Sequence, residues 1–255
     1  MSKIISIANQ KGGVAKTTST HNLGTALAKK GKKTLIVDLD SQASLTISVG
    51  LEPLEIENNI TSILQKNKNK IDINNCITHL KENLDIITSI IDLAQLEIEM
   101  LSRSSREKIL DRALEPIKDK YDFILIDCPP QLNILTINAL SCSDFVIIPV
   151  KTDYLSYRGL TQLQDTISEI KELINPKLEI LGIITTFFEK NVKDDREILE
   201  QLEKEYNVIG IIKKQVAAKK GIYKGLSAVE QSKTKNISIE YNKVADLIIK
   251  RSIQR

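Results

Sequence analysis

The chain has 255 residues, of which 42% are hydrophobic and 27% are charged, and its formal net charge is +3. This composition is typical of a globular protein, and the longest apolar runs fall well short of the roughly 20 residues that cross a bilayer. The cysteines and histidines follow neither a disulfide nor a zinc pattern. We therefore expect a cytoplasmic protein without an export signal, in which any metal is held by oxygen.

Short apolar runs that predict buried strands alternate with segments that have helical spacing. The strands are expected at 4–8, 34–37, 84–87, 121–126, 145–150 and 180–188. The helices are expected at 17–29, 107–117, 160–173 and 198–206. This alternation predicts an α/β fold with a mostly parallel, twisted sheet that helices cover on both faces. We expect a single domain over 1–255, with a surface loop at 65–75 and no helix-turn-helix domain ahead of the first strand.

The segment between the first strand and the first helix has the composition of a phosphate-binding loop. It reads Lys11-Gly12-Gly13-Val14-Ala15-Lys16-Thr17-Thr18. Small residues let backbone N–H groups surround phosphate oxygens at the N-terminus of a helix, so the whole segment is expected to bind ATP. Lys16 is expected to reach the β- and γ-phosphates, and the Thr17 hydroxyl to bind Mg²⁺. The general P-loop pattern fails, because Gln10 and Ala15 stand where it has glycine.

The segment instead matches the form KGGxxK[ST], and further motifs follow it along the chain. They read VDLDSQA at 37–43, IDCPP at 126–130 and LTINAL at 135–140. With these motifs in this order, the chain resembles the ParA/MinD group of ATPases with a deviant phosphate loop. It is most similar to the small ParA or Soj-like partition proteins of that group. The resemblance is strong from Lys3 to about Val150 and weaker beyond it.

The resemblance implies roles for the charged residues of these motifs. Lys11 resembles a signature lysine that reaches the phosphates of the partner subunit in a nucleotide-sandwich dimer, which would couple dimerisation to ATP. Asp40 resembles the aspartate that positions the attacking water, so catalysis is expected to depend on Asp40, Lys11 and Lys16. Asp38 and Asp127 resemble residues near the Mg²⁺ ion. The alternative is that Asp38 caps a turn and Asp127 caps a helix.

The same resemblance implies where the adenine base lies. It is expected between the segment that follows the strand ending at Thr186 and the segment 212–215. Thr186 and Lys213 are the candidate contacts. The family often has IPRN where this chain reads IKKQ. The assignment therefore depends more on the positions of these residues in the chain than on their residue types.

Lysines gather late in the chain. Between Tyr206 and Val229 there are five lysines and neither Asp nor Glu. Contacts between lysines and phosphates give DNA binding without sequence preference, and in similar proteins this region binds nucleoid DNA in the ATP-bound dimer. The family motif RxSEA is absent, and a solvated lysine-rich surface is the alternative. The candidate DNA contacts are Lys190, Lys193, Lys213, Lys214, Lys219, Lys220 and Lys224.

The leading hypothesis is an ATP-dependent switch for plasmid or chromosome partition. Its ATP-bound homodimer would bind DNA non-specifically and be released when a ParB-like activator stimulates hydrolysis, so the protein would associate with the nucleoid. A positioning ATPase for a protein cargo stays open, and so does a MinD-like division-site regulator at the membrane. The apolar residues of 237–253 favour a core-facing helix over stable membrane association. An iron–sulfur carrier would need paired cysteines, whose spacing Cys128 and Cys142 lack.

Overall fold

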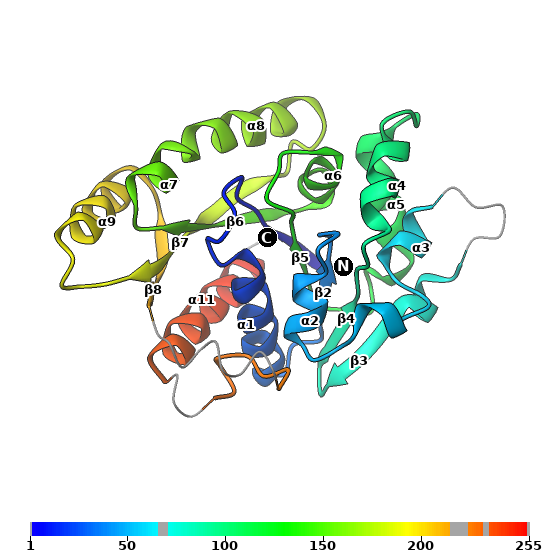
Figure 1. Cartoon of the computed structure of the whole chain (residues 1–255), viewed down its shortest axis with the longest axis horizontal. Coiled ribbons are helices and arrows are strands. Elements are labelled where there is room, and N and C mark those ends of the chain that lie inside the picture. The colour runs from blue at the N-terminus through cyan, green and yellow to red at the C-terminus, as the bar shows by residue number, and fades with distance from the viewer. Residues whose placement is uncertain (1, 66–70, 215–223, 232–234, 254–255) are drawn as a thin grey trace.

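The fold is built on a central sheet, seen here in a computed structural model that describes residues 2–65, 71–214, 224–231 and 235–253. In these residues the sheet has eight strands in the order β3-β4-β2-β5-β1-β6-β7-β8. All neighbouring strands run parallel except β3 and β4, which are antiparallel. Figure 1 shows the twisted sheet with helices on both of its faces. The predicted α/β fold is confirmed.

The strands in chain order are β1 (Lys3–Ile7), β2 (Thr34–Asp38), β3 (Ile77–Lys81), β4 (Leu84–Ile87), β5 (Phe123–Asp127), β6 (Phe145–Lys151), β7 (Glu179–Phe188) and β8 (Val208–Lys213). The helices are α1 (Lys16–Lys29), α2 (Ser44–Ser48), α3 (Ile60–Leu64), α4 (Leu93–Met100), α5 (Ile109–Leu114), α6 (Ile134–Cys142), α7 (Tyr154–Arg158), α8 (Leu160–Leu173), α9 (Lys193–Glu205) and α11 (Lys235–Ile253). Short 3-10 turns at Pro53–Glu55, Ile73–Cys76, Arg106–Lys108 and Glu115–Ile117 link some of them.

Each predicted strand is present. The differences between the predicted and the observed elements lie at the boundaries of the elements and at the edges of the sheet. The helix expected at 107–117 is divided into α5 and a 3-10 turn on either side, the last of which contains a proline near its start. The helix expected at 198–206 is the second half of α9. Of the surface loop expected at 65–75, residues 66–70 lie outside the described residues, and the 3-10 turn that begins at Ile73 buries that side chain.

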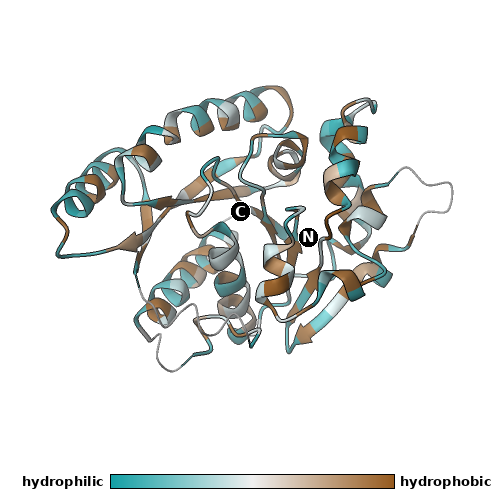
Figure 2. Ribbon diagram, viewed as in Figure 1, coloured by the Kyte–Doolittle hydropathy of each residue, from teal (hydrophilic) through white to brown (hydrophobic). Residues whose placement is uncertain are grey.

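The central strands are apolar on both faces because two hydrophobic cores form, one on each side of the sheet. In β5, Phe123 and Leu125 join the core under α1 and α11, whereas Ile124 and Ile126 join the core under α5, α6 and α8. Such strands read as continuous apolar runs, which is why the sequence predicts them well. Figure 2 shows the hydrophobic strands inside and mixed hydropathy on the outer helices.

Helix α1 lies close against the sheet and so brings the phosphate loop to the carboxyl ends of the strands. A Cβ atom on Gly24 would come within 2.6 Å of Ile36 Cγ2 in β2, so this approach needs glycine. On its other side α1 packs against α11, whose Tyr241, Val244 and Ile248 are buried. None of the helices in the described part of the chain is both long and apolar enough to cross a bilayer.

A candidate nucleotide-binding site

The phosphate loop connects β1 to α1 through two left-handed residues. Gly13 has φ +73° and Ala15 has φ +68°. For alanine this conformation costs about 1–2 kcal/mol. Ala15 therefore keeps the backbone shape that a glycine would adopt freely. Cβ atoms added to Gly12 or Gly13 would have no neighbour within 4 Å, so the loop is open on the side where phosphates would enter.

Lys16 begins α1 and folds back over the loop. Its Nζ donates a hydrogen bond to the carbonyl oxygen of Lys11 at 3.2 Å, and its side chain is buried. Burial lowers the pKa of the Lys16 ammonium, and the nearby carboxylate of Asp127 acts in the opposite direction. A buried cation at the N-terminus of a helix, above an open loop, suits a polyphosphate.

Asp38 and Asp127 are register partners at the carboxyl ends of β2 and β5. Asp38 Oδ2 accepts hydrogen bonds from the backbone N and the Oγ1 of Thr46, both at 2.8 Å, and its Oδ1 accepts one from the backbone N of Asp40 at 3.2 Å. Burial raises the pKa of Asp38 to about 6. Asp38 thus anchors α2 through Thr46, and its role as a metal ligand stays a prediction.

Asp127 has an oxygen that is available for a ligand. Its Oδ1 accepts a hydrogen bond from Thr20 Oγ1 at 3.3 Å, whereas its Oδ2 is buried without a hydrogen-bond partner among the described residues. Burial, and then the charge of Asp38, raise its pKa, while Thr17 and Lys16 act to lower it. Mg²⁺ is usually bound by one or two carboxylates together with substrate phosphates. Asp127 and Thr17 fit that arrangement, and no cluster of three or more metal-binding side chains occurs in the described residues.

Asp40 lies in the loop between β2 and α2 and is half-buried. Its Oδ1 accepts a hydrogen bond from the backbone N of Gln42 at 3.0 Å, which forms a local turn. Its charge acts to raise the pKa values of Lys16 and Asp127, so it lies within electrostatic reach of both groups. A half-buried carboxylate within electrostatic reach of the site is suited to orienting a water molecule.

Lys11 points away from Lys16, although both belong to the loop. Its Nζ donates to Asp153 Oδ1 at 2.7 Å, and both side chains are about one-third exposed. Burial acts to raise the pKa of Asp153, but the hydrogen bonds from Lys11 and from the backbone of Ser156 lower it below its usual value. Exposed ion pairs contribute about 0–1 kcal/mol, so little energy opposes the movement of Lys11 to another anion.

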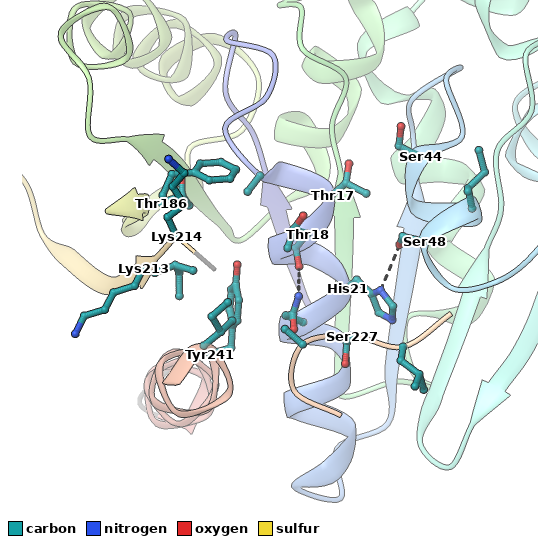
Figure 3. Close-up of a pocket in the computed structure, with 18 residues that line it drawn as sticks. Thr17, Thr18, His21, Ser44, Ser48, Thr186, Lys213, Lys214, Ser227 and Tyr241 are labelled. Carbon is teal, nitrogen blue, oxygen red and sulfur yellow. Dashed lines mark hydrogen bonds between the residues drawn. The ribbon is translucent and has the colours of Figure 1, made fainter. Parts of the chain in front are cut away.

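A cavity of about 550 Å³ extends from the phosphate loop. Five of the predicted ATP contacts line it, and these are Ala15, Thr17, Thr18, Thr186 and Lys213. Figure 3 shows Thr186 on one side of α1 and Ser48 on the other, with Thr17 between them. Thr186 Oγ1 donates to the carbonyl oxygen of Val14 at 3.2 Å, which ties β7 to the loop.

The cavity wall also includes residues that the sequence analysis missed. Tyr241 comes from α11 and Phe187 from β7, and no local motif marks either of them. His21 lies one turn after Thr17 on α1, so helical spacing alone could have placed it beside the site. The three cysteines play no part in this wall, and burial raises the pKa of the Cys128 thiol to about 12.

His21 makes stability depend on pH. It is 3% exposed, its Nδ1 lies 3.3 Å from Ser48 Oγ, and burial lowers its pKa from 6.5 to about 4. In this pH range the unfolded chain binds a proton that folded His21 does not, so the free energy of unfolding falls as pH drops from 6.5 to 4. This contribution is about 3 kcal/mol over the window. The raised pKa of Asp38 changes the free energy of unfolding in the opposite direction as pH drops. The contribution of His21 is therefore measured by comparing the parent protein with a His21 variant.

We expect His21→Gln to lose less stability than the parent protein when pH is lowered from 6.5 to 4. The difference should approach about 3 kcal/mol in urea unfolding measured at a series of pH values. His79→Gln is the matched control, since His79 is an exposed imidazole paired with Asp85. Equal pH profiles for His21→Gln and the parent protein would show that His21 does not carry this dependence.

The candidate DNA contacts form a less basic surface than their number suggests. The described lysines of the set, Lys190, Lys193, Lys213, Lys214 and Lys224, are all exposed. Lys193 Nζ lies 3.3 Å from Glu197 Oε1 and Lys214 Nζ lies 2.7 Å from Glu189 Oε1. Lys219 and Lys220 lie outside the described residues. DNA binding by this surface stays a prediction.

Comparison with known proteins identifies the family. The profile of a family described as an AAA domain matches residues 2–180. The sporulation initiation inhibitor protein Soj of Bacillus subtilis is 44% identical over 204 residues, which are 80% of each chain. The chromosome-partitioning ATPase Soj of Treponema pallidum is 36% identical over the full length of both chains. The chain belongs to the Soj/ParA family of partition ATPases.

Other relatives of this Soj/ParA family member differ in length. Two uncharacterized proteins of Mycobacterium tuberculosis are 41% identical over 201 residues, and the chain spans 63% of their length. Among solved structures, a putative plasmid partition protein of Borrelia burgdorferi bound to AMPPNP is 31% identical, with a TM-score of 0.81 and coverage of 98% and 99%. Cobyrinic acid a,c-diamide synthase of Mycobacterium smegmatis, with ADP and magnesium, is 31% identical, with a TM-score of 0.82 and coverage of 98% and 94%.

Proposed function

We propose that this chain is an ATP-dependent switch for plasmid or chromosome partition. The observation that carries the proposal is the buried Lys16 above an open glycine loop, with the unpartnered Oδ2 of Asp127 beside it. The proposal also rests on the family and on two similar structures, one bound to AMPPNP and one with ADP and magnesium. Its activity is the hydrolysis of ATP to ADP and phosphate, at a low intrinsic rate.

The residues of the site have different roles in phosphoryl transfer. Lys16 and the backbone N–H groups of the loop bind the phosphates. Asp127 and Thr17 would hold Mg²⁺, which would neutralise charge on the phosphate oxygens. Asp40 orients the attacking water. Each role depends on position and charge, which is where catalysis of this reaction mainly arises.

The proposed dimerisation depends on Lys11. In one subunit its ammonium is held by Asp153, away from Lys16. We infer that a second subunit with ATP bound offers a stronger anion, so Lys11 leaves Asp153 and contacts the partner's phosphates. The nucleotide then lies between two subunits, and ATP controls the oligomeric state.

The output of the switch is non-specific DNA binding by the ATP-bound homodimer in the cytoplasm, which places the protein on the nucleoid until a ParB-like activator stimulates hydrolysis. Two subunits double the number of lysines that face one DNA segment. Affinity that depends on phosphate contacts falls with salt by about 0.9 logarithmic units per contact per decade of salt concentration. A protein cargo is the second candidate, and DNA binding separates the two.

The test is DNA affinity in the presence of ATP, ADP and no nucleotide. Replacement of four lysines by glutamate is expected to abolish ATP-dependent binding equally on all DNA sequences, because phosphate contacts carry no base information. The variant carries Lys190→Glu, Lys219→Glu, Lys220→Glu and Lys224→Glu. Of these positions, Lys190 and Lys224 belong to the described residues and do not line the cavity. The control carries Lys171→Glu and Lys177→Glu, two exposed positions outside this surface. If ATP never improves DNA binding by the parent protein, a protein cargo is preferred.

A further inference from the structure

Residues 224–231 form a segment, here called the strap, that is attached to three separate elements of the fold. To α1 it is attached by a hydrogen bond, in which the backbone N of Val229 donates to Asn22 Oδ1 at 3.0 Å. To β3 it is attached by an ion pair between Glu230 and Lys81, the last residue of that strand. Both attachments join positions that lie far apart in the sequence, so only the folded chain has this strap.

The third attachment is a contact between two backbones. Gly225 of the strap has φ +63°, and Gly50, which follows α2, has φ +87°. A Cβ atom on Gly225 would lie 2.5 Å from the carbonyl oxygen of Val49, and a Cβ atom on Gly50 would lie 3.2 Å from the Cα atom of Gly225. Gly225 therefore needs to be glycine because of this close approach as well as because of its left-handed backbone. The strap packs directly against the C-terminal end of α2.

Helix α2 connects this contact to the candidate nucleotide site. Its Thr46 donates two hydrogen bonds to Asp38, which is the register partner of Asp127 at the carboxyl ends of the strands. The helix has only five residues, and Val49 is its C-cap. Because so short a helix moves as one unit, a displacement at Thr46 is carried to Val49 and from there to the strap.

The strap and α2 also form two walls of the cavity that extends from the phosphate loop. The residues that line it are Ser44, Ile47 and Ser48 from α2, and Leu226, Ser227 and Ala228 from the strap. Figure 3 shows Ser48 next to His21, and Ser227 beside α1 and below His21. A ligand that fills the cavity therefore acts on both walls at once.

We propose that the strap couples the nucleotide site to the lysine-rich segment that ends at Lys224. The inference rests on the proposed function and states how the same site regulates DNA binding. Nucleotide in the cavity stabilises the contact of Gly225 with α2, and this contact holds the adjacent, exposed Lys224 in position to meet DNA. Coupling between two sites typically changes affinity by about 5-fold to about 150-fold and is reciprocal, so DNA raises the affinity for nucleotide by the same factor.

The ratio of the DNA affinities measured with and without a non-hydrolysable ATP analogue tests this coupling. We expect Gly225→Ala to bind the analogue and to reduce the ratio to about one, because its Cβ atom does not fit beside Val49. Gly50→Ala, with a less severe approach, should reduce the ratio in part. Gly31→Ala is the matched control, since Gly31 has φ +74° and open space around an added Cβ atom. A ratio that both strap-contact variants keep, or that Gly31→Ala loses equally, would overturn the proposal.

Amide hydrogen exchange gives a measurement that does not depend on DNA. In the parent protein the analogue should slow exchange of the strap amides by about fivefold or more, including the Val229 amide that is bonded to Asn22. Gly225→Ala should lose this protection, and Gly31→Ala should keep it. If the parent protein binds no analogue, the proposed function fails. If it binds the analogue and exchange in the strap does not change, this inference alone fails.

Discussion

Substitution of Asp40 by alanine is expected to slow ATP hydrolysis about a hundredfold or more and to leave ATP binding intact. Asp40 is not part of the phosphate loop, and its Oδ1 accepts a hydrogen bond from the backbone N of Gln42. Its charge nevertheless acts on Lys16 and Asp127, so we expect it to act on the reacting phosphate as well. Single-turnover hydrolysis and the ATP dissociation constant separate the two effects. The variant should accumulate as the ATP-bound dimer.

Asp40→Asn is the matched control for the local turn. An asparagine oxygen can still accept the hydrogen bond from Gln42, so the loop keeps its shape while the charge is lost. Slow hydrolysis in both variants assigns the effect to the carboxylate, and slow hydrolysis in Asp40→Ala alone assigns it to the turn. Normal turnover in both would move the role to another residue, of which Asp38 is the nearest in sequence.

The central part of the fold could be predicted because its signal is local. Strands β1, β2, β5 and β6 are buried on both faces and therefore read as continuous apolar runs. Two outer strands gave no such signal. β3 is half-exposed along its length, and β8 is interrupted by Gly210, where a Cβ atom would come within 2.8 Å of Val244. Edge strands depend on tertiary packing that a local pattern does not contain.

The candidate site, like the fold, has one part that could be predicted from the sequence and one part that could not. The phosphate loop is one contiguous segment, so its residues could be named from the sequence alone. The cavity wall joins Ala15, Phe187 and Tyr241, which are brought together by the order of the strands and by the packing of α11 against α1. Ion pairs such as Lys214 with Glu189 also join distant positions, so a count of lysines overestimates the positive charge of the folded surface. A local sequence pattern does not show which distant charges form ion pairs or which distant residues line the same cavity.

Lys11→Ala is expected to bind ATP in the monomer and to lose ATP-dependent dimerisation. The monomer should keep its affinity because Lys11 Nζ is bonded to Asp153, while Lys16 covers the loop. The dimer should weaken by at least about tenfold, since a hydrogen bond to a charged group contributes about 1.5–3 kcal/mol. Sedimentation with a non-hydrolysable ATP analogue, at several protein concentrations, measures this loss.

Asp153→Asn tests the same mechanism in the opposite direction. Asp153 Oδ1 also accepts a hydrogen bond from the backbone N of Ser156 at 2.8 Å and caps α7, a role that asparagine can keep. The substitution removes the charge that holds Lys11 within its own subunit, and with it a longer ion pair between Asp153 Oδ2 and Lys151 Nζ at 3.9 Å. We therefore expect Asp153→Asn to dimerise at a lower protein concentration than the parent protein when the analogue is present. Dimers of unchanged strength in Lys11→Ala would contradict the role of Lys11 across the interface.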